Sequence, residues 1–152
     1  MNDTGAAMTR EEAILAAMAA GGPDAEYTPA KIQKLMFIID REMADHVGGP
    51  FFDFGPYHYG PFDAAVYEVL EDLEEKGLVR IDTSGMVRRY FLSVRGYEQG
   101  RALLDGCQDK IRSALKTLAE WILPLSFSDL VSAIYQTYPD MKVNSIFREP
   151  SD

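Results

Sequence analysis

The chain has few of the residues that metal sites and disulfides require. Its 152 residues include one cysteine, Cys107, and two histidines, His46 and His58. A lone cysteine excludes an internal disulfide and is typical of a reducing, cytoplasmic environment. The two histidines lie twelve positions apart and far from the cysteine, which is not the spacing of a metal site. We therefore expect neither a metal nor another cofactor.

Long hydrophobic runs and a targeting signal are also missing. The longest apolar stretches fall well short of the ~20 residues that cross a bilayer, and Met1–Met8 has neither a basic nor an apolar segment. The sequence thus predicts no signal peptide and no membrane association. Because 47% of the residues are hydrophobic, with eight tyrosines and eight phenylalanines, it predicts a single folded domain over residues 1–152 with flexible ends.

Positive charge is scarce, and the formal net charge of −9 is unevenly distributed. Residues 63–76 contain six carboxylates and one lysine, whereas residues 80–116 contain eight basic and four acidic residues. Such a polarised chain favours charged partners or self-association, so a homodimer is one candidate assembly. The acidic segment and the basic segment that follows it are expected to meet, within one chain or across a dimer.

Helix-capping signals and hydrophobic spacing predict a mostly helical chain. The capping box Thr9-Arg-Glu-Glu12 predicts a helix over residues 10–20. Thr28-Pro29 predicts the start of a second helix, which Gly48-Gly49-Pro50 ends. Asp63, Ser93 and Ser126 are capping residues, and each predicts a helix that follows it. An apolar stripe from Cys107 to Ile122 predicts one more helix.

Two stretches between these helices carry strand and turn signals. Leu78–Asp82 and Met86–Leu92 flank Thr83-Ser84-Gly85, a pattern that predicts a β-hairpin. By contrast, Phe51–Phe54 is typical of a short strand or extended edge, and the prolines of Gly55–Phe62 predict turns. The resulting order of helix, aromatic turn, helix and hairpin is that of a winged helix.

We therefore predict an α/β, mostly α, fold in one domain. A winged-helix-like core is expected over about residues 28–95, with the hairpin as its wing, and a C-terminal helical layer over about residues 96–140. In this arrangement Leu70 and Leu73 should be buried between the helices and the hairpin, because they lie on the apolar face of the helix before the wing.

Two groups of residues in this core are candidates for recognition. Lys31, Gln33 and Lys34 lie off the apolar stripe of their helix, and the simplest interpretation is a solvated face. The functional interpretation is one partner-binding surface shared with the turn Tyr57-His58-Tyr59-Gly60-Pro61. The rings of that turn could equally pack at the edge of the core, although tyrosine is also a favoured interface anchor.

The same two segments carry a family resemblance. Lys31-Ile-Gln-Lys-Leu-Met-Phe37 resembles the Lys-Leu-Gln-Lys-Leu-Leu-Tyr signature of the Panacea domain, found in SocA-like antitoxins of bacteria and their prophages. Pro50-Phe-Phe-Asp53, Tyr59-Gly-Pro61 and Val66-Tyr67 are similar to further elements of that family in the same order. The match covers about residues 28–95, and the chain is also similar to the small YwgA-like bacterial proteins.

The resemblance implies a winged-helix-like adaptor that binds another protein, such as a toxin or effector encoded nearby. On this reading the protein is a non-catalytic, antitoxin-like interaction module of a bacterial or prophage toxin–antitoxin system, without a cofactor. The implied partner-binding residues come from the two matching segments: Lys31, Lys34, Tyr57, His58, Tyr59, Gly60 and Pro61.

A DNA-binding transcriptional regulator of the winged-helix type is the alternative. Such proteins place the helix before the wing in the major groove. Here that helix spans residues 64–76, and its outward carboxylates would be repelled by phosphates. Arg80, Arg88 and Arg89 around the hairpin are nevertheless candidate nucleic-acid contacts.

An enzyme is the remaining class. His58, close in sequence to Asp53, could act as a general base in a hydrolase, but no nucleophile accompanies it. Cys107 lies on the apolar stripe of its helix, which predicts an inert core thiol rather than a nucleophile.

Overall fold

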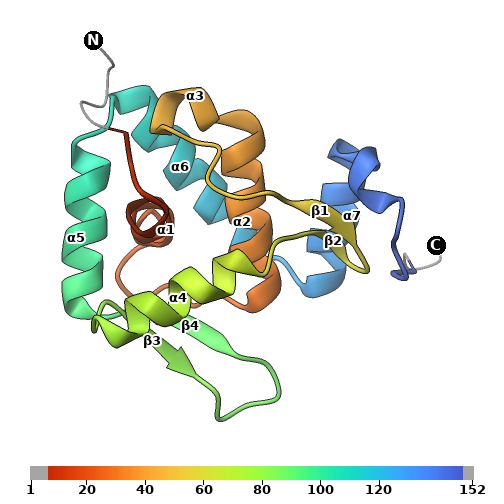
Figure 1. The fold of residues 1–152 in the computed structure, drawn as a ribbon, viewed down its shortest axis with the longest axis horizontal. Coiled ribbons are helices and arrows are strands. Elements are labelled where there is room, and N and C mark those ends of the chain that lie inside the picture. Colours follow the sequence, from red (N-terminus) through yellow and green to blue (C-terminus); the bar gives the residue numbers. More distant parts are fainter. Residues whose placement is uncertain (1–6, 149–152) are drawn as a thin grey trace.

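The computed structural model describes residues 7–148 of the chain. Over this range the protein is mixed α/β and mostly helical, as predicted, with seven α-helices, one 3-10 helix and two small antiparallel hairpins (Figure 1). The two chain ends, expected to be flexible, and most of Met1–Met8 lie outside the described residues. No helix between residues 7 and 148 is long and apolar enough to cross a membrane.

The elements follow one another along the chain with short connections. The helices are α1 (Arg10–Ala19), α2 (Pro29–Glu42), α3 (Ala44–Val47), α4 (Ala65–Glu75), α5 (Val94–Asp105), α6 (Asp109–Ile122), α7 (Phe127–Thr137) and the 3-10 helix η1 (Pro139–Lys142). The strands are β1 (Gly55–Tyr57), β2 (Gly60–Phe62), β3 (Val79–Asp82) and β4 (Arg89–Leu92).

Helix α1 lies at the centre of the molecule. It packs against α2, α4, α5, α6 and β4 (Figure 1), and every residue from Ala13 to Ala20 is buried. Its alanine-rich sequence permits this, because small side chains let neighbouring helices approach closely. At Gly100 of α5, an added Cβ would lie 2.4 Å from the carbonyl oxygen of Leu15, so only glycine fits this crossing.

The hairpin predicted between Leu78 and Leu92 is present as β3–β4, which follows α4. Its strands pair from Val79 opposite Leu92 to Asp82 opposite Arg89, so β4 begins three residues later than expected. A single antiparallel bridge between Tyr27 and Tyr90 adds a further segment to its edge. Leu70 and Leu73 of α4 are fully buried, as predicted from the spacing of its apolar residues.

The segment Gly55–Phe62 forms a second hairpin, where the sequence predicted only turns. β1 pairs with β2, and Pro56 stands opposite Pro61. Alternate residues of an antiparallel pair direct their N–H groups away from the partner strand, so two opposed prolines are compatible with the ladder. The expected strand or extended edge at Phe51–Phe54 lies outside every strand of the described structure and leads into β1.

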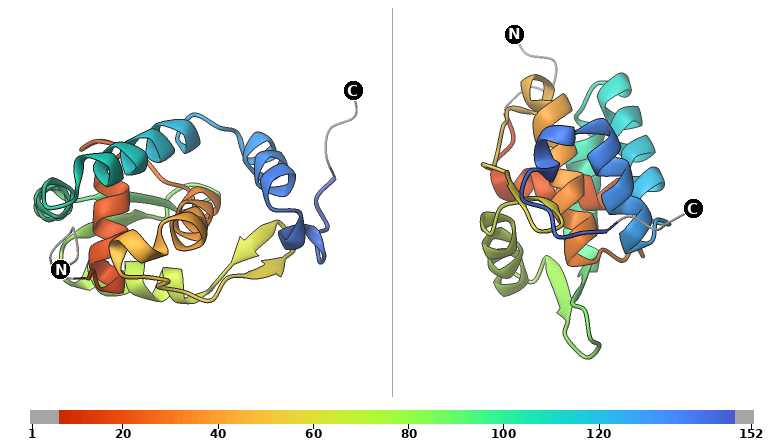
Figure 2. Two further views of the ribbon diagram at one scale, coloured as in Figure 1. Left: turned by 90° about the horizontal axis from the view of Figure 1, so that it is seen from above. Right: turned by 90° about the vertical axis from the view of Figure 1, so that its right-hand side faces the viewer.

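The C-terminal elements cover α2 and the β1–β2 hairpin. Helix α6 packs against α1 and α2, and α7 packs against α2 and β2. The β1–β2 hairpin, α7 and η1 gather at one end of the molecule, away from α1 and α5 (Figures 1 and 2). The chain then returns to β1, where Asn144 donates a hydrogen bond to the carbonyl of Pro56 and the Ile146 amide donates one to the carbonyl of His58.

Most predicted helix starts are correct. Thr9 and Glu12 form the reciprocal capping box, and Ser93 and Ser126 each accept a hydrogen bond from the third residue of their helix. The second predicted helix is interrupted at Met43, where α2 ends and the short α3 begins. The 3-10 helix after α7 was not predicted, because its sequence has no strong periodicity.

Candidate functional site

A pocket of about 350 Å³ opens between α2 and the β1–β2 hairpin. We call it the hairpin pocket. Its lining comes from α2, the hairpin, α4 and α7: Pro29, Ala30, Gln33, Lys34, Tyr57, His58, Tyr59, Gly60, Phe62, Tyr67 and Phe127. Five of the seven predicted partner-binding residues therefore meet around one cavity, although they come from segments more than twenty residues apart.

Lys34 is the only buried charged residue in the described part of the chain, with an exposed fraction of 4%. Its ammonium makes no hydrogen bond or ion pair with residues 7–148, and no aspartate or glutamate lies among the described pocket residues. Burial therefore lowers the pKa of Lys34 to about 8, from an ordinary value of 10.5. The pocket thus combines apolar walls with one uncompensated cation.

The expected solvated face of α2 is wrong for Gln33 and Lys34. Gln33 is 1% exposed, and its side-chain amide exchanges two hydrogen bonds with the backbone of Asp63, at 2.9 and 3.0 Å. The hairpin covers this side of α2, while α1 and α6 cover the apolar stripe. The spacing of apolar residues predicts only the contact with α1 and α6, because a polar face gives no signal that another element covers it.

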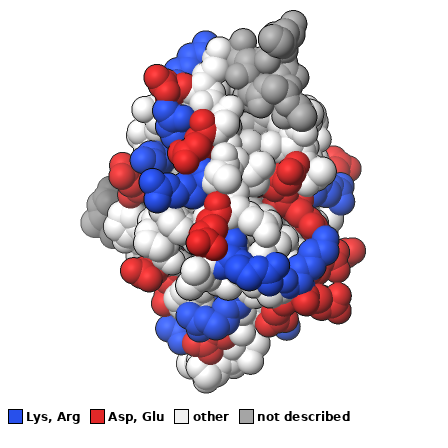
Figure 3. Space-filling view, turned by 90° about the vertical axis from the view of Figure 1, so that its left-hand side faces the viewer, with Lys and Arg blue, Asp and Glu red and all other residues white. Residues whose placement is uncertain are grey.

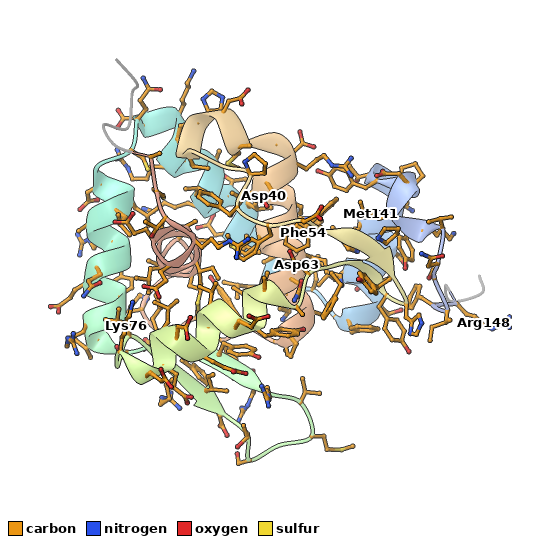
Figure 4. All side chains as sticks on the ribbon, in the orientation of Figure 1. Asp40, Phe54, Asp63, Lys76, Met141 and Arg148 are labelled. Atoms are coloured by element: carbon orange, nitrogen blue, oxygen red, sulfur yellow. The ribbon has the colours of Figure 1, made fainter. Side chains whose placement is uncertain are left out.

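The segment that carries the hairpin is anchored to α2 at both ends. Asp40 accepts hydrogen bonds from the amides of Phe51 and Phe52, at 2.8 and 2.9 Å. The Asp63 carboxylate accepts one from the Asp53 amide at 2.7 Å, and Gln33 fixes the Asp63 backbone. Figure 4 labels Asp40, on α2, and Asp63, in the connection between β2 and α4. Desolvation raises the pKa of Asp40 above its ordinary value, and the two backbone hydrogen bonds oppose this shift only in part.

This anchoring places the hairpin turn directly over Lys34. Gly60 has a φ of 105°, a conformation that side chains other than glycine's rarely adopt. A Cβ at this position would lie 3.5 Å from both Lys34 Cε and Tyr135 Cε1, so the glycine separates these two side chains. The Tyr135 hydroxyl is buried without a hydrogen-bond partner in the described structure.

Three aromatic side chains stand at the mouth of the pocket with large exposed fractions. Tyr57 is 53% exposed, Tyr59 is 43% exposed and Phe127 is 47% exposed. Tyr59 and Phe127 make an edge-to-face contact with ring centroids 5.2 Å apart. Phe127 is missing from the sequence-based predictions, because it follows Tyr59 by more than sixty residues and no local pattern connects them.

Lys31 and Pro61 are the two predicted site residues that do not line the pocket. The Lys31 ammonium donates a hydrogen bond of 2.6 Å to the Leu123 carbonyl, at the C-terminal end of α6. A cation at this end complements the helix dipole, so Lys31 has a structural role. Pro61 is buried in β2, opposite Pro56.

The candidate nucleic-acid contacts are largely engaged by neighbouring groups. Arg88 lies 3.8 Å from Glu71 of α4, which brings the acidic helix and the basic hairpin together within one chain, as predicted. Arg89 pairs with Asp82 at 2.5 Å and with Glu26 at 3.3 Å. The Arg80 guanidinium lies 4.2 Å above the Phe91 ring. On the face that carries α5, positive and negative side chains are intermixed (Figure 3).

Groups that could support catalysis or metal binding are separated from one another. His58 and Asp53 make no hydrogen bond to each other in the described structure, and no cluster of three or more potential metal ligands occurs within residues 7–148. Cys107 is buried, its thiol donates a hydrogen bond to the Leu103 carbonyl, and burial raises its pKa. A thiol in this environment is unreactive.

No protein-family model, curated protein or solved structure matches this chain. The resemblance to the Panacea and YwgA-like proteins therefore stays a prediction.

Proposed function

We propose that the protein is a non-catalytic interaction module that binds a segment of a partner protein at the hairpin pocket. The observation that carries this proposal is the group of Tyr57, Tyr59 and Phe127, three large rings exposed around one cavity on a firmly anchored hairpin. Tyrosine and phenylalanine bury much area at little entropic cost, and they are enriched in protein interfaces.

The anchoring of the hairpin strengthens this interpretation. Asp40, Gln33 and Asp63 hold the flanking segment by hydrogen bonds, so the exposed rings are presented by a preorganised element. A preorganised surface loses little conformational entropy on binding, which favours affinity.

We further propose that residues 28–95 form a winged-helix-like core with β3–β4 as its wing. The order of α2, α4 and the wing, and the Tyr27–Tyr90 bridge at the wing's edge, support this assignment. With the resemblance of the Lys31–Phe37 segment, this favours an antitoxin-like adaptor in the cytoplasm, whose partner is a toxin or effector encoded nearby.

The DNA-binding alternative has weaker support. The outward face of α4 carries exposed carboxylates, including Glu68 and Glu71, and the arginines of the wing are paired with acids or stacked on a ring. Phosphate neutralisation by free cations provides most non-specific affinity for DNA. A low-salt mobility shift with random duplex, lost when Arg88 and Arg89 are replaced, would support DNA binding instead.

The test is a binding measurement with the product of the adjacent gene. Tyr59→Ala and Phe127→Ala should each weaken binding by at least about tenfold, as expected for central interface anchors. Met86→Ala is the matched control, because Met86 is fully exposed on the wing loop, away from the pocket. Equal affinity of the wild type and both pocket variants for a partner that does bind would contradict the proposal.

A further inference from the structure

We propose that the hairpin pocket recognises a carboxylate carried by an otherwise apolar segment, and that the Lys34 ammonium is the ion-pair partner of this carboxylate. This inference rests on the proposed function, because it names the chemistry of the segment that the pocket accepts. It adds a specific anchor at the base of the pocket to the aromatic rings at its mouth.

Among the polar side chains of α2, that of Lys34 alone has no hydrogen-bond or ion-pair partner within residues 7–148. Lys31 donates to the end of α6, and Gln33 fixes the backbone of Asp63. Lys34 is as buried as its apolar neighbours, yet its ammonium makes no contact that compensates its charge in the described structure. An unpaired buried cation is destabilising, so packing alone gives no reason to retain a lysine here.

Within residues 7–148, no acidic side chain supplies the missing negative charge. No carboxylate lies among the described residues that line the pocket, and no acidic residue lies in the first turn of α2. The pocket also reaches Pro29 and Ala30 in that turn, where the helix dipole favours an anion. An ion pair formed in this apolar environment is less screened than one at the surface.

The charge and the lining of the pocket favour one kind of anion. The pocket offers one ammonium and mostly aromatic walls, and the chain has a net charge of −9. A phosphate or a strongly acidic segment would bring more charge than one lysine neutralises, and the net charge of the protein would repel it. A single carboxylate on an apolar body is neutralised by Lys34 while its body contacts the rings.

The other titratable side chains that line the pocket in the described structure include no carboxylate. Those that line the pocket are His58 and three tyrosines, Tyr57, Tyr59 and Tyr67. Tyr135 lies behind Gly60 with an unpaired hydroxyl, which can donate a hydrogen bond to a ligand oxygen that reaches it. Burial raises the pKa of Tyr67, so this phenol stays neutral.

The experiment compares two probes that differ only in charge, 4-phenylbutyrate and its neutral amide. The side-chain resonances of Lys34, assigned by comparison with Lys34→Met, are followed by NMR during a pH titration of the protein. We expect the acid to raise the pKa of Lys34 by about one unit or more, because an adjacent anion favours the ammonium. The amide should leave it unchanged, and Lys34→Met should bind the acid at least about tenfold more weakly.

Three results would overturn the inference. These are equal binding of the acid and the amide to the wild type, equal binding of the acid to the wild type and Lys34→Met, and tighter binding of phenyl phosphate than of the acid. The comparison of acid and amide uses the wild type alone, so it does not depend on how the variant folds.

The identified partner separates this inference from the proposed function. Synthetic peptides from the bound segment of this partner then locate the carboxylate. One pair has a free or an amidated C-terminus, and in the others one acidic side chain is replaced by its amide. If Tyr59→Ala weakens binding while all these peptides bind equally well, the proposed interaction module is supported and the proposed recognition of a carboxylate is wrong. If Tyr59→Ala leaves partner binding unchanged, the proposed function falls first.

Discussion

The two hairpins of this protein differ in how the rest of the chain holds them. The β1–β2 hairpin is anchored by α2 at both of its flanks, covered by α7 and contacted by the segment after η1. The β3–β4 hairpin, which we propose to be a wing and refer to by that name, rests on α4 with one side, and Met86 and Val87 of its loop are exposed to solvent. The first encloses a buried cation, whereas the charged groups of the second are paired at the surface.

This difference separates a desolvated, unpaired charge beneath one hairpin from solvent-exposed ion pairs on the other. The surface ion pairs of the wing contribute little free energy, because water and salt screen them. The charge beneath the β1–β2 hairpin is desolvated and unpaired, so it is costly in the free protein and valuable to a ligand that neutralises it. Four sets of substitutions test this difference between the hairpins, from the largest expected effect on stability to the smallest.

Removing the support of the wing should have the largest effect. Leu73→Ala should lower the free energy of unfolding by roughly 2–5 kcal/mol, because Leu73 is fully buried in the core beneath β3. Met86→Ala, in the exposed loop of the same hairpin, should change it by less than about 0.5 kcal/mol. Denaturant melts measure both values, and a loss well under about 1 kcal/mol for Leu73→Ala would contradict the packing of α4.

Removing the buried charge should stabilise the protein. The pKa of Lys34 is about 8 in the folded chain and 10.5 ordinarily, which corresponds to a cost of about 3 kcal/mol below pH 8. This cost declines as the pH rises from about 8 to 10.5, because the folded chain has then released the Lys34 proton, and releasing it costs less free energy as the pH approaches the unfolded value. Lys34→Met should therefore be up to about 3 kcal/mol more stable at pH 7, and the gain should shrink above pH 8.

The control for this variant is Lys116→Met, because Lys116 is exposed on α6. Its effect on stability should be small and nearly independent of pH. Thermal melts of both variants across this pH range provide the measurement. A Lys34→Met variant that is less stable than the wild type at pH 7 would show that the ammonium has a compensating partner in the folded state.

A matched pair of glycines distinguishes the two turns. Gly60→Ala should cost about 1–3 kcal/mol, since its φ of 105° strains any residue with a Cβ. Gly85 in the wing loop has no such φ, and a Cβ there would lie 3.8 Å from the Val87 carbonyl oxygen, an ordinary van der Waals contact, so Gly85→Ala should fall within about 0.5 kcal/mol of the wild type. Equal effects of the two substitutions would show that the β1–β2 turn is as relaxed as the wing loop.

The smallest effect is expected from the charges of the wing. Replacing Arg88 and Arg89 together by glutamate should destabilise the protein by about 1 kcal/mol at ~10 mM salt, and by less at ~1 M salt. The reason is that both arginines face carboxylates of the same chain, on α4, β3 and the segment before α2. Melts at the two salt concentrations test this, and sedimentation shows whether a dimer depends on the same residues.

Local signals in the sequence predicted the elements whose environment is also local. The Thr9 capping box and the apolar spacing of α4 each act within a few residues and give the structure expected. Thr83-Ser84-Gly85 lies in the loop of the predicted hairpin, although β4 begins three residues later than expected. The β1–β2 hairpin was missed because Pro56 and Pro61 argue against strands, and only their opposed positions make the pairing possible.

The sequence by itself determined that this chain is mostly helical, where most of its helices begin, and that a cluster of tyrosines and lysines is a candidate site. The tertiary structure alone decided that Lys34 is buried without a counter-ion and that Phe127 joins the rings of the hairpin. The physical reason is that burial and pKa depend on what covers a residue from outside its own helix. For α2 the cover is the β1–β2 hairpin, which begins more than twenty residues after Lys34 and is held over it by Asp40 and Gln33.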